Sequence, residues 1–278
     1  MKKIGFIEYY LDEWHANHYP DMIAELSGGE YKVCYAWAKV ESPKEGALTN
    51  RQWADQFGVE LLDTMEEVIE KSDCLIVLSP DNPEMHEELC RLPLQSGKLT
   101  YVDKTFAPDK ESALRIFANA DAHGTKCFSS SALRYASELD EIDTSSIVKI
   151  YSEGPGRLEI YVIHQLEPIM RLMKSRAKRL MFTGTPDFPS MIVEFEDGRL
   201  AELHLAKGMK FRITVCDAEN RGKEYVVESD YFRLFLQSVL RFFDTGVVPV
   251  PHEQTVDVMA VRAAAMAAST KPYQWFDL

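Results

Sequence analysis

Three features are scarce in this 278-residue sequence, and each absence excludes a class of protein. Cysteine occurs only five times, far apart and never as C-x-x-C, so neither a disulfide framework nor a cysteine zinc site is indicated. No apolar run approaches the roughly 20 residues that a membrane-spanning helix needs. The apolar stretch after Met1 is too short for a signal peptide and is interrupted by Glu8. We therefore expect a soluble, cytoplasmic protein.

Positive charge is also in short supply. The chain has 31 Lys and Arg residues against 44 Asp and Glu residues, a net charge of −13. Such a surface repels phosphate backbones, which argues against binding to nucleic acid. The seven histidines show neither H-x-x-x-H nor H-E-x-x-H spacing, and no cluster of Cys and His occurs, so the sequence predicts no metal site.

What the sequence does contain is ample apolar material arranged in two patterns. The first half alternates short apolar runs with helical periodicity, which is typical of β-α-β units and a parallel sheet covered on both faces. Strands are predicted at 4–7, 31–38, 60–62, 74–78, 99–102 and 125–128, and helices at 19–26, 50–57, 64–71, 84–94 and 110–122. Residues 1–130 therefore predict an α/β domain, a doubly wound Rossmann-type sheet of about six strands.

The second half, residues 131–278, has consecutive strands joined by short turns. Strands are predicted near 147–152, 179–183, 190–195, 200–206, 210–216 and 224–227, and helices near 164–175, 231–243 and 254–269. The turn Glu196-Asp197-Gly198-Arg199 is a hairpin signal. This pattern predicts an α+β domain with a mostly antiparallel open sheet and helices on one face.

The first turn, where a dinucleotide would bind, departs from the G-x-G-x-x-G pattern. Gly5 remains, but Ile7 stands where the second glycine would let the backbone approach a phosphate, and Glu8 adds negative charge nearby. After the second strand, Lys39 occupies the place of the acidic residue that holds a ribose in NAD-binding domains. Lys39 either tolerates the 2′-phosphate of NADP or is a solvated surface lysine.

Three stretches in order resemble the Gfo/Idh/MocA superfamily, named after glucose–fructose oxidoreductase and inositol dehydrogenase. The first has Ser79-Pro80, then Gly97-Lys98, then Asp103-Lys104-Thr105. The second, residues 160–173, contains His164, and the third, residues 235–251, ends in a Gly-x-x-Pro turn. The opening turn, from Leu11 to His15, is also similar to a branch whose first loop reads Leu-Asp-Thr-Ser-His.

The resemblance implies an NAD(P)-dependent oxidoreductase that acts on a sugar, a polyol or a related hydroxy compound. It assigns Lys104 to polarising the substrate hydroxyl and His164 to acid–base catalysis. Together with the first-turn reading it gives the expected cofactor-binding residues as Gly5, Ile7, Lys39, Ser79, Pro80 and Asp103. It also implies a homodimer or higher homo-oligomer, formed through the second domain's sheet.

Two departures keep a second hypothesis open. Thr105 replaces the family's proline, and Ile160 replaces an aspartate four residues before His164. With the missing glycines, they favour a non-catalytic relative that kept the fold and binds a small molecule or a partner without nicotinamide chemistry.

Three further expectations concern polar side chains outside this set. His15 and His86 are read as surface or helix-terminal residues, and the run Ser129-Ser130-Ser131 as the cap of a helix beginning near Ala132. We further predict that Lys104 and His164, with His164 at the start of its helix, line one cleft between the two domains.

Overall fold

The computed structural model describes all 278 residues, which form two compact units. The first unit comprises Met1–Ser130 and Leu236–His252, and the second comprises Ser131–Phe235 and Glu253–Leu278. The sequence analysis placed 131–278 in one domain, whereas Leu236–His252 packs with the first unit. Aromatic contacts hold this segment to the first unit. The ring of Phe242 meets that of Phe128 edge-on, with 5.0 Å between centroids, and the ring of Phe243 lies 6.2 Å from that of Tyr31.

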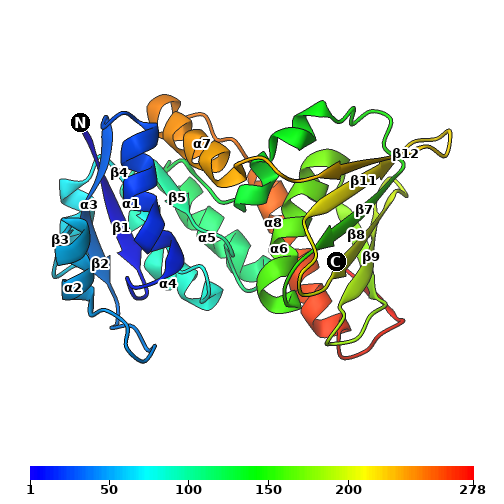
Figure 1. Ribbon diagram of the computed structural model, residues 1–278. Coiled ribbons are helices and arrows are strands. Elements are labelled where there is room, and N and C mark those ends of the chain that lie inside the picture. The colour runs from blue at the N-terminus through cyan, green and yellow to red at the C-terminus, as the bar shows by residue number, and fades with distance from the viewer. The chain divides into compact units, whose positions relative to one another are not determined.

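The first unit contains a six-stranded parallel sheet in the order β3-β2-β1-β4-β5-β6, as predicted (Figure 1). Its strands are β1 (Lys2–Glu8), β2 (Tyr31–Ala38), β3 (Glu60–Leu61), β4 (Cys74–Val77), β5 (Thr100–Val102) and β6 (Cys127–Phe128). Its first five helices are α1 (Trp14–Leu26), α2 (Asn50–Phe57), α3 (Met65–Lys71), α4 (His86–Leu89) and α5 (Lys110–Ala122). Every residue of β4 is buried, as expected for a strand with both faces covered.

Local sequence explains where the helices of this unit begin and end. Thr49 and Thr64 each close a capping box at the start of α2 and α3. The helix predicted over 84–94 is instead a short α4 between two 3₁₀ turns, Pro83–Met85 and Pro93–Gln95. The second of these begins at Pro93, which has no N–H to continue an α-helix.

The second unit contains a seven-stranded sheet in the order β12-β11-β7-β10-β9-β8-β13. Neighbouring strands are antiparallel except β7 and β10, so the prediction of a mostly antiparallel sheet is confirmed. Its strands are β7 (Lys149–Gly154), β8 (Ala177–Phe182), β9 (Ser190–Phe195), β10 (Leu200–Leu205), β11 (Arg212–Cys216), β12 (Gly222–Val226) and β13 (Trp275–Asp277). Its helices are α6 (Leu158–Met173) and α8 (His252–Ala268), whereas α7 (Tyr231–Thr245) lies mostly in the first unit.

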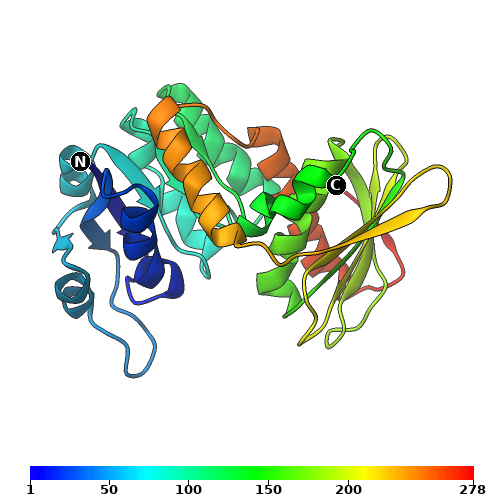
Figure 2. The same ribbon diagram turned by 45° about the horizontal axis from the view of Figure 1, so that its top comes forward.

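One face of this sheet is covered by helices, and α6 contacts β7 and β10 (Figure 2). Every second residue of β9 and β10 is buried on that face. On the alternate positions, Glu194 pairs with Arg179 and Glu202 pairs with Lys149. This second face is therefore partly charged, and association of two copies through it stays a prediction.

Hydropathy along the helices bears on membranes as well. None of them combines the length and the apolar character that crossing a bilayer would require.

Candidate active site

The ends of two central strands bring four predicted residues to one edge of the first sheet. β4 pairs with β5, so Ser79 and Pro80 after β4 lie beside Asp103 and Lys104 after β5. The backbone N–H of Asp103 donates to the carbonyl of Val77 at 2.8 Å, which holds the two strand ends together. The Lys104 ammonium lies 3.5 Å from the carbonyl oxygen of Pro80. These residues meet at the carboxyl edge of the sheet, where ligands of doubly wound folds bind.

Backbone strain marks the same edge. Ser79 has a φ of 120°, a region that non-glycine residues rarely adopt. It is 2% exposed, and its hydroxyl donates to the carbonyl of Asn82 at 3.0 Å. Such conformations cost free energy and cluster at functional sites. The strain therefore supports a role for the turn after β4.

Asp103 is a buried carboxylate with three donors. Its side chain is fully buried and accepts from the Tyr101 hydroxyl at 3.0 Å and from the Lys104 N–H at 2.8 Å. Its other oxygen meets Nδ1 of His15 on α1. Burial alone would raise the pKa of Asp103, but the charge and hydrogen bond of His15 outweigh it, and the pKa is lowered. Asp103 is therefore an anion at neutral pH.

His86 contacts both the turn after β4 and the turn after β5. It is the first residue of α4, so of the two expected alternatives it is helix-terminal and, being fully buried, not a surface residue. Its Nε2 lies 3.0 Å from the carbonyl of Leu78, and its Nδ1 lies 2.9 Å from that of Thr105. Burial lowers the pKa of His86. This imidazole links the turn after β4 to the turn after β5 and has a positioning role.

The start of α1 does not fit the pyrophosphate of a dinucleotide in its usual position. The N-cap residue is Glu13, whose carboxylate accepts from the N–H of His15 at 2.8 Å and of Ala16 at 2.6 Å. These are the donors that a phosphate would use. The start of α2 also packs on the first turn: Asn50 Oδ1 accepts from Leu11 N–H at 3.1 Å.

Glu8 is a second buried carboxyl group, close to Glu13. Glu8 ends β1 and is 1% exposed, and one oxygen accepts from the Tyr9 N–H at 2.8 Å. Its Oε2 is buried without a hydrogen-bond partner. Burial and the charge of Glu13 raise the pKa of Glu8 well above its usual value. The carboxyl group of Glu8 therefore favours its neutral form, and it supplies none of the positive charge that a bound phosphate would need.

The other predicted cofactor residues of the first unit have other partners. Gly5 lies within β1, and an added Cβ would come within 2.3 Å of Ser72 Oγ and 2.5 Å of Val68 Cγ1, so its missing side chain makes room for packing. Ile7 is fully buried in the same strand. Lys39 pairs with Glu88 near the surface. Cofactor binding by these three residues stays a prediction.

His164 lies in the second unit, in the middle of α6. The helix predicted to begin at His164 begins at Leu158, because apolar residues continue at helical spacing through Val162 and Ile163. Ile160 therefore shares a helix face with His164, one turn earlier, rather than lying in a strand.

A serine stands against this histidine. Ser131 Oγ lies 2.6 Å from His164 Nδ1, and Ser131 is fully buried. The expectation that this hydroxyl caps the next helix is wrong, since Ser131 makes no side-chain cap bond to the 3₁₀ helix that follows. The rings of Tyr161 and Phe211 meet the imidazole edge-on at 5.5 and 6.0 Å. A hydroxyl thus contacts the histidine, whereas Ile160 stands at the position where the resemblance implies an aspartate.

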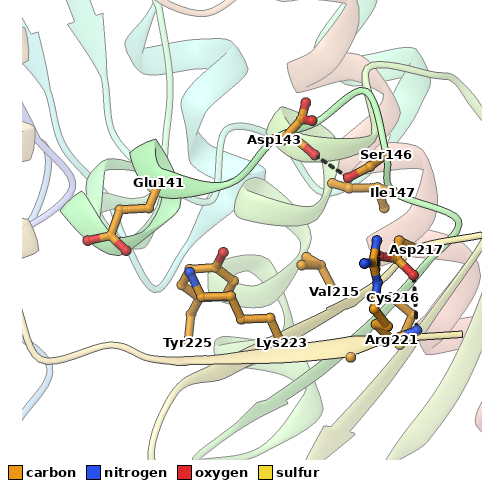
Figure 3. Close-up of a pocket in the computed structure, with 11 residues that line it drawn as sticks. Glu141, Asp143, Ser146, Ile147, Val215, Cys216, Asp217, Arg221, Lys223 and Tyr225 are labelled. Atoms are coloured by element: carbon orange, nitrogen blue, oxygen red, sulfur yellow. Dashed lines mark hydrogen bonds and ion pairs between the residues drawn. The ribbon is translucent and has the colours of Figure 1, made fainter. Parts of the chain in front are cut away.

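A separate cavity of about 310 Å³ lies in the second unit, along β11 and β12 (Figure 3). Its lining includes Asp143, Asp217 and Arg221, and Arg221 is paired with Asp217 at 2.7 Å. It contains none of the predicted site residues. Across the whole chain, no three His, Cys, Asp or Glu side chains are placed to hold a metal ion together.

No protein-family model and no curated protein matches the chain by sequence. Solved structures match over nearly the whole length. GenD2 from gentamicin A biosynthesis, in complex with NAD, has a TM-score of 0.76 at 12% identity, with 100% of this chain and 97% of that chain covered. UDP-N-acetylglucosamine 3-dehydrogenase from Acidithiobacillus ferrooxidans has a TM-score of 0.76 at 12% identity, covering 96% and 97%. The apo scyllo-inositol dehydrogenase from Lactobacillus casei has a TM-score of 0.77 at 14% identity, covering 99% and 98%.

These structural matches establish the fold. The chemistry has to be argued from the residues of this chain. The expected fold, a Rossmann-type domain followed by a mostly antiparallel sheet, is confirmed by these structural matches. Sequence reasoning missed the contacts of His15, Glu8 and Ser131, because their partners are distant in sequence: Asp103 is 88 residues from His15, and Ser131 is 33 residues from His164. One signal was available for the first pair, since the ends of β1 and β5 both point to the carboxyl edge of a parallel sheet.

Proposed function

We propose that this chain, which has the fold of the Gfo/Idh/MocA superfamily, is an oxidoreductase that acts on a sugar, a polyol or a related small hydroxy compound. The observation that carries the proposal is Lys104, a nearly buried cation at the carboxyl edge of a Rossmann-type sheet. An ammonium in that place can polarise a substrate hydroxyl and stabilise developing negative charge on its oxygen.

His164 supports the proposal from the second unit. An imidazole titrates near neutral pH and can exchange the proton of a hydroxyl group. Ser131 fixes one ring nitrogen and thereby the orientation of the ring. We also propose that Lys104 and His164 act in one site, and that the protein assembles into a homo-oligomer.

The proposed electron carrier is a nicotinamide nucleotide, NAD or NADP. Structural relatives support this class of cofactor, one of them solved with NAD. Because Glu13 occupies the start of α1, the nucleotide would have to bind without the usual phosphate contact there. We assign no reaction step to it.

A second candidate function is favoured by the same carboxylates. Glu13 accepts from the N–H groups of His15 and Ala16, which are the donors that the phosphate of a dinucleotide would use. A relative that kept the fold and binds a small molecule or a partner without nicotinamide chemistry would show this arrangement.

Nucleotide binding distinguishes the two functions. The thermal midpoint of the protein is measured with NAD, NADH, NADP and NADPH, since a ligand that binds the native state raises it. Under the leading proposal at least one nucleotide raises the midpoint by several degrees, and turnover follows with inositols or hexoses. No shift with any of the four nucleotides would leave the second function in its place.

A matched pair of variants shows where the nucleotide binds. Glu13→Ser keeps a capping side chain and removes one negative charge, and Asp21→Ser removes one from an exposed position on the same helix. Nucleotide affinity that rises only in Glu13→Ser, by about fivefold or more, would place phosphate at α1 after all. Equal affinity in both variants supports binding away from α1.

A further inference from the structure

The cavity of about 310 Å³ in the second unit contains none of the residues that the proposed function uses. Residues 141–147, before β7, form one side of it, and the hairpin of β11 and β12 forms the other (Figure 3). Cavities that bind small molecules range from roughly 300 to 1,000 Å³. This one therefore suits a ligand at the small end of that range.

The charged side chains that line the cavity are three carboxylates and two cations. One of the cations is already neutralised, because the Arg221 guanidinium contacts Asp217 at 2.7 Å and Glu219, which lies outside the lining, at 3.1 Å. Hydrogen bonding to Arg221 lowers the pKa of Asp217. This corner of the cavity therefore needs no partner from a ligand.

Lys223, the other cation, has an aromatic partner instead of a carboxylate. Its Nζ lies 4.5 Å from the centroid of the Tyr225 ring, a cation–π contact. Tyr225 is the main cause of a raised pKa for Lys223, and the charge of Glu141 contributes without forming an ion pair. The ammonium is therefore fully protonated at neutral pH and can donate to a carboxylate that enters the cavity.

Glu141 and Asp143 are two carboxylates that no cation of the protein neutralises. Oδ1 of Asp143 accepts from the Ser145 hydroxyl at 2.7 Å and from the Ser145 N–H at 2.9 Å, and these hydrogen bonds lower the pKa of Asp143. In Figure 3 no hydrogen bond or ion pair reaches the side chain of Glu141. The uncompensated charge of the lining is thus two negative groups against one positive group.

Apolar surface lies beside these charges. Ile147 and Tyr225 are buried, and together with Val215 they line the same cavity. Such surface can cover the methylene chain of a ligand whose ends are charged. The excess of carboxylates disfavours phosphates and dicarboxylates. No three His, Cys, Asp or Glu side chains are placed to hold a metal ion. The lining therefore suits a molecule with a short aliphatic chain, two cationic groups and one carboxylate.

We propose that this cavity binds a free basic amino acid, such as lysine, ornithine or arginine. The carboxylate of the amino acid accepts from the Lys223 ammonium, and its two cationic groups donate to Glu141 and Asp143. Its methylene chain packs on the apolar part of the lining. This site does not depend on the proposed function, so nucleotide binding and turnover neither support nor weaken it.

Calorimetric titration of the full-length protein with matched compounds tests the ligand class. L-Lysine is expected to bind with a Kd of about 1 mM or tighter. Cadaverine lacks the carboxylate and L-norleucine lacks the side-chain ammonium, so each should bind about tenfold more weakly or worse, because each loses a charged hydrogen bond. Absence of saturable binding by lysine, ornithine and arginine, or equally tight binding of L-glutamate, would overturn the proposal.

Variants of single charged residues test the location. Glu141→Gln and Lys223→Gln should each raise the Kd of L-lysine by about tenfold. The controls are Glu224→Gln, next to Lys223 on β12 but paired with Arg212 at 3.4 Å and outside the lining, and the exposed Lys207→Gln. An equal effect of the control variants would mean that cations gather on an acidic surface without a defined site, and the assignment would be wrong.

Two half-buried free thiols allow a measurement in the unmutated protein. Cys216 lines the cavity, whereas Cys34 on β2 lies in the first unit and serves as the internal control. L-Lysine at roughly ten times its Kd should slow alkylation of Cys216 by iodoacetamide by about tenfold and leave Cys34 unaffected, since a bound ligand covers only the cavity. Mass spectrometry of the labelled peptides reports both rates. Equal rates at Cys216 with and without L-lysine would place the amino acid elsewhere and refute the proposal.

Discussion

Two histidines in this chain are held through the same ring nitrogen by partners of different charge. In the first unit, Nδ1 of His15 meets the Asp103 carboxylate, and in the second unit, Nδ1 of His164 meets the Ser131 hydroxyl. A carboxylate fixes the tautomer and stabilises the imidazolium, whereas a hydroxyl can donate or accept and carries no charge. The comparison teaches that the carboxylate can only accept from the His15 ring nitrogen, whereas the hydroxyl is compatible with either tautomer of His164.

The largest effect is expected from removing the two predicted catalytic side chains together. Lys104→Met and His164→Gln should each lower kcat/KM by about 100-fold or more. If both act on one substrate hydroxyl, the double variant should lose scarcely more than either single variant, because groups that act as a unit are strongly non-additive. Steady-state kinetics of the four proteins, with the exposed Lys32→Met as control, measures this.

The opposite outcome is a double variant whose loss of kcat/KM equals the product of the two single losses. It would mean that Lys104 and His164 act independently of each other. The shared cleft predicted from the sequence would then be wrong.

A smaller effect is expected when the neutral partner is removed. Ser131→Ala should lower kcat by about two- to tenfold, because one neutral hydrogen bond contributes only about 1 kcal/mol. Ser131→Thr keeps the hydroxyl and should restore most of the rate. The split between kcat and KM and the tautomer of His164 by NMR check the role, since a merely structural serine would leave the tautomer unchanged.

The fold was largely predictable because hydrophobic periodicity is a local signal. Runs such as Cys74–Val77 and Ser190–Phe195 indicate buried and half-buried strands directly. The sequence analysis missed the short edge strand Trp275–Asp277, whose partner β8 is about 95 residues away. It also placed the start of α6 six residues late, although apolar residues continue at helical spacing back to Leu158.

The candidate site was predictable only where strand order fixes it. Ser79, Pro80, Asp103 and Lys104 meet because neighbouring parallel strands end at one edge. The partners of those residues were not predictable, since a side chain chooses its contact by three-dimensional proximity. Glu13 shows the limit, because only the fold reveals that its carboxylate caps α1.

The smallest effect, on stability alone, is expected at the acidic start of α1. Burial raises the pKa of Glu8 above its value in the unfolded chain, so the native state binds more protons than the unfolded state as pH rises past about 4.5. The free energy of unfolding therefore falls with increasing pH until Glu8 ionises in the folded protein. Glu8→Gln removes this dependence, because the amide is neutral and can donate to Glu13 while still accepting from the Tyr9 N–H.

The variant should be more stable than the wild type by on the order of 1 kcal/mol at pH 8, with a smaller gain at pH 5. Urea unfolding at both pH values measures it. Glu30→Gln, at an exposed position before β2, is the control for net charge. An equal gain in both variants would mean that general repulsion in a chain of net charge −13 is relieved. A lower free energy of unfolding for Glu8→Gln than for the wild type at pH 8 would mean that the folded protein requires the charged form of the Glu8 carboxylate.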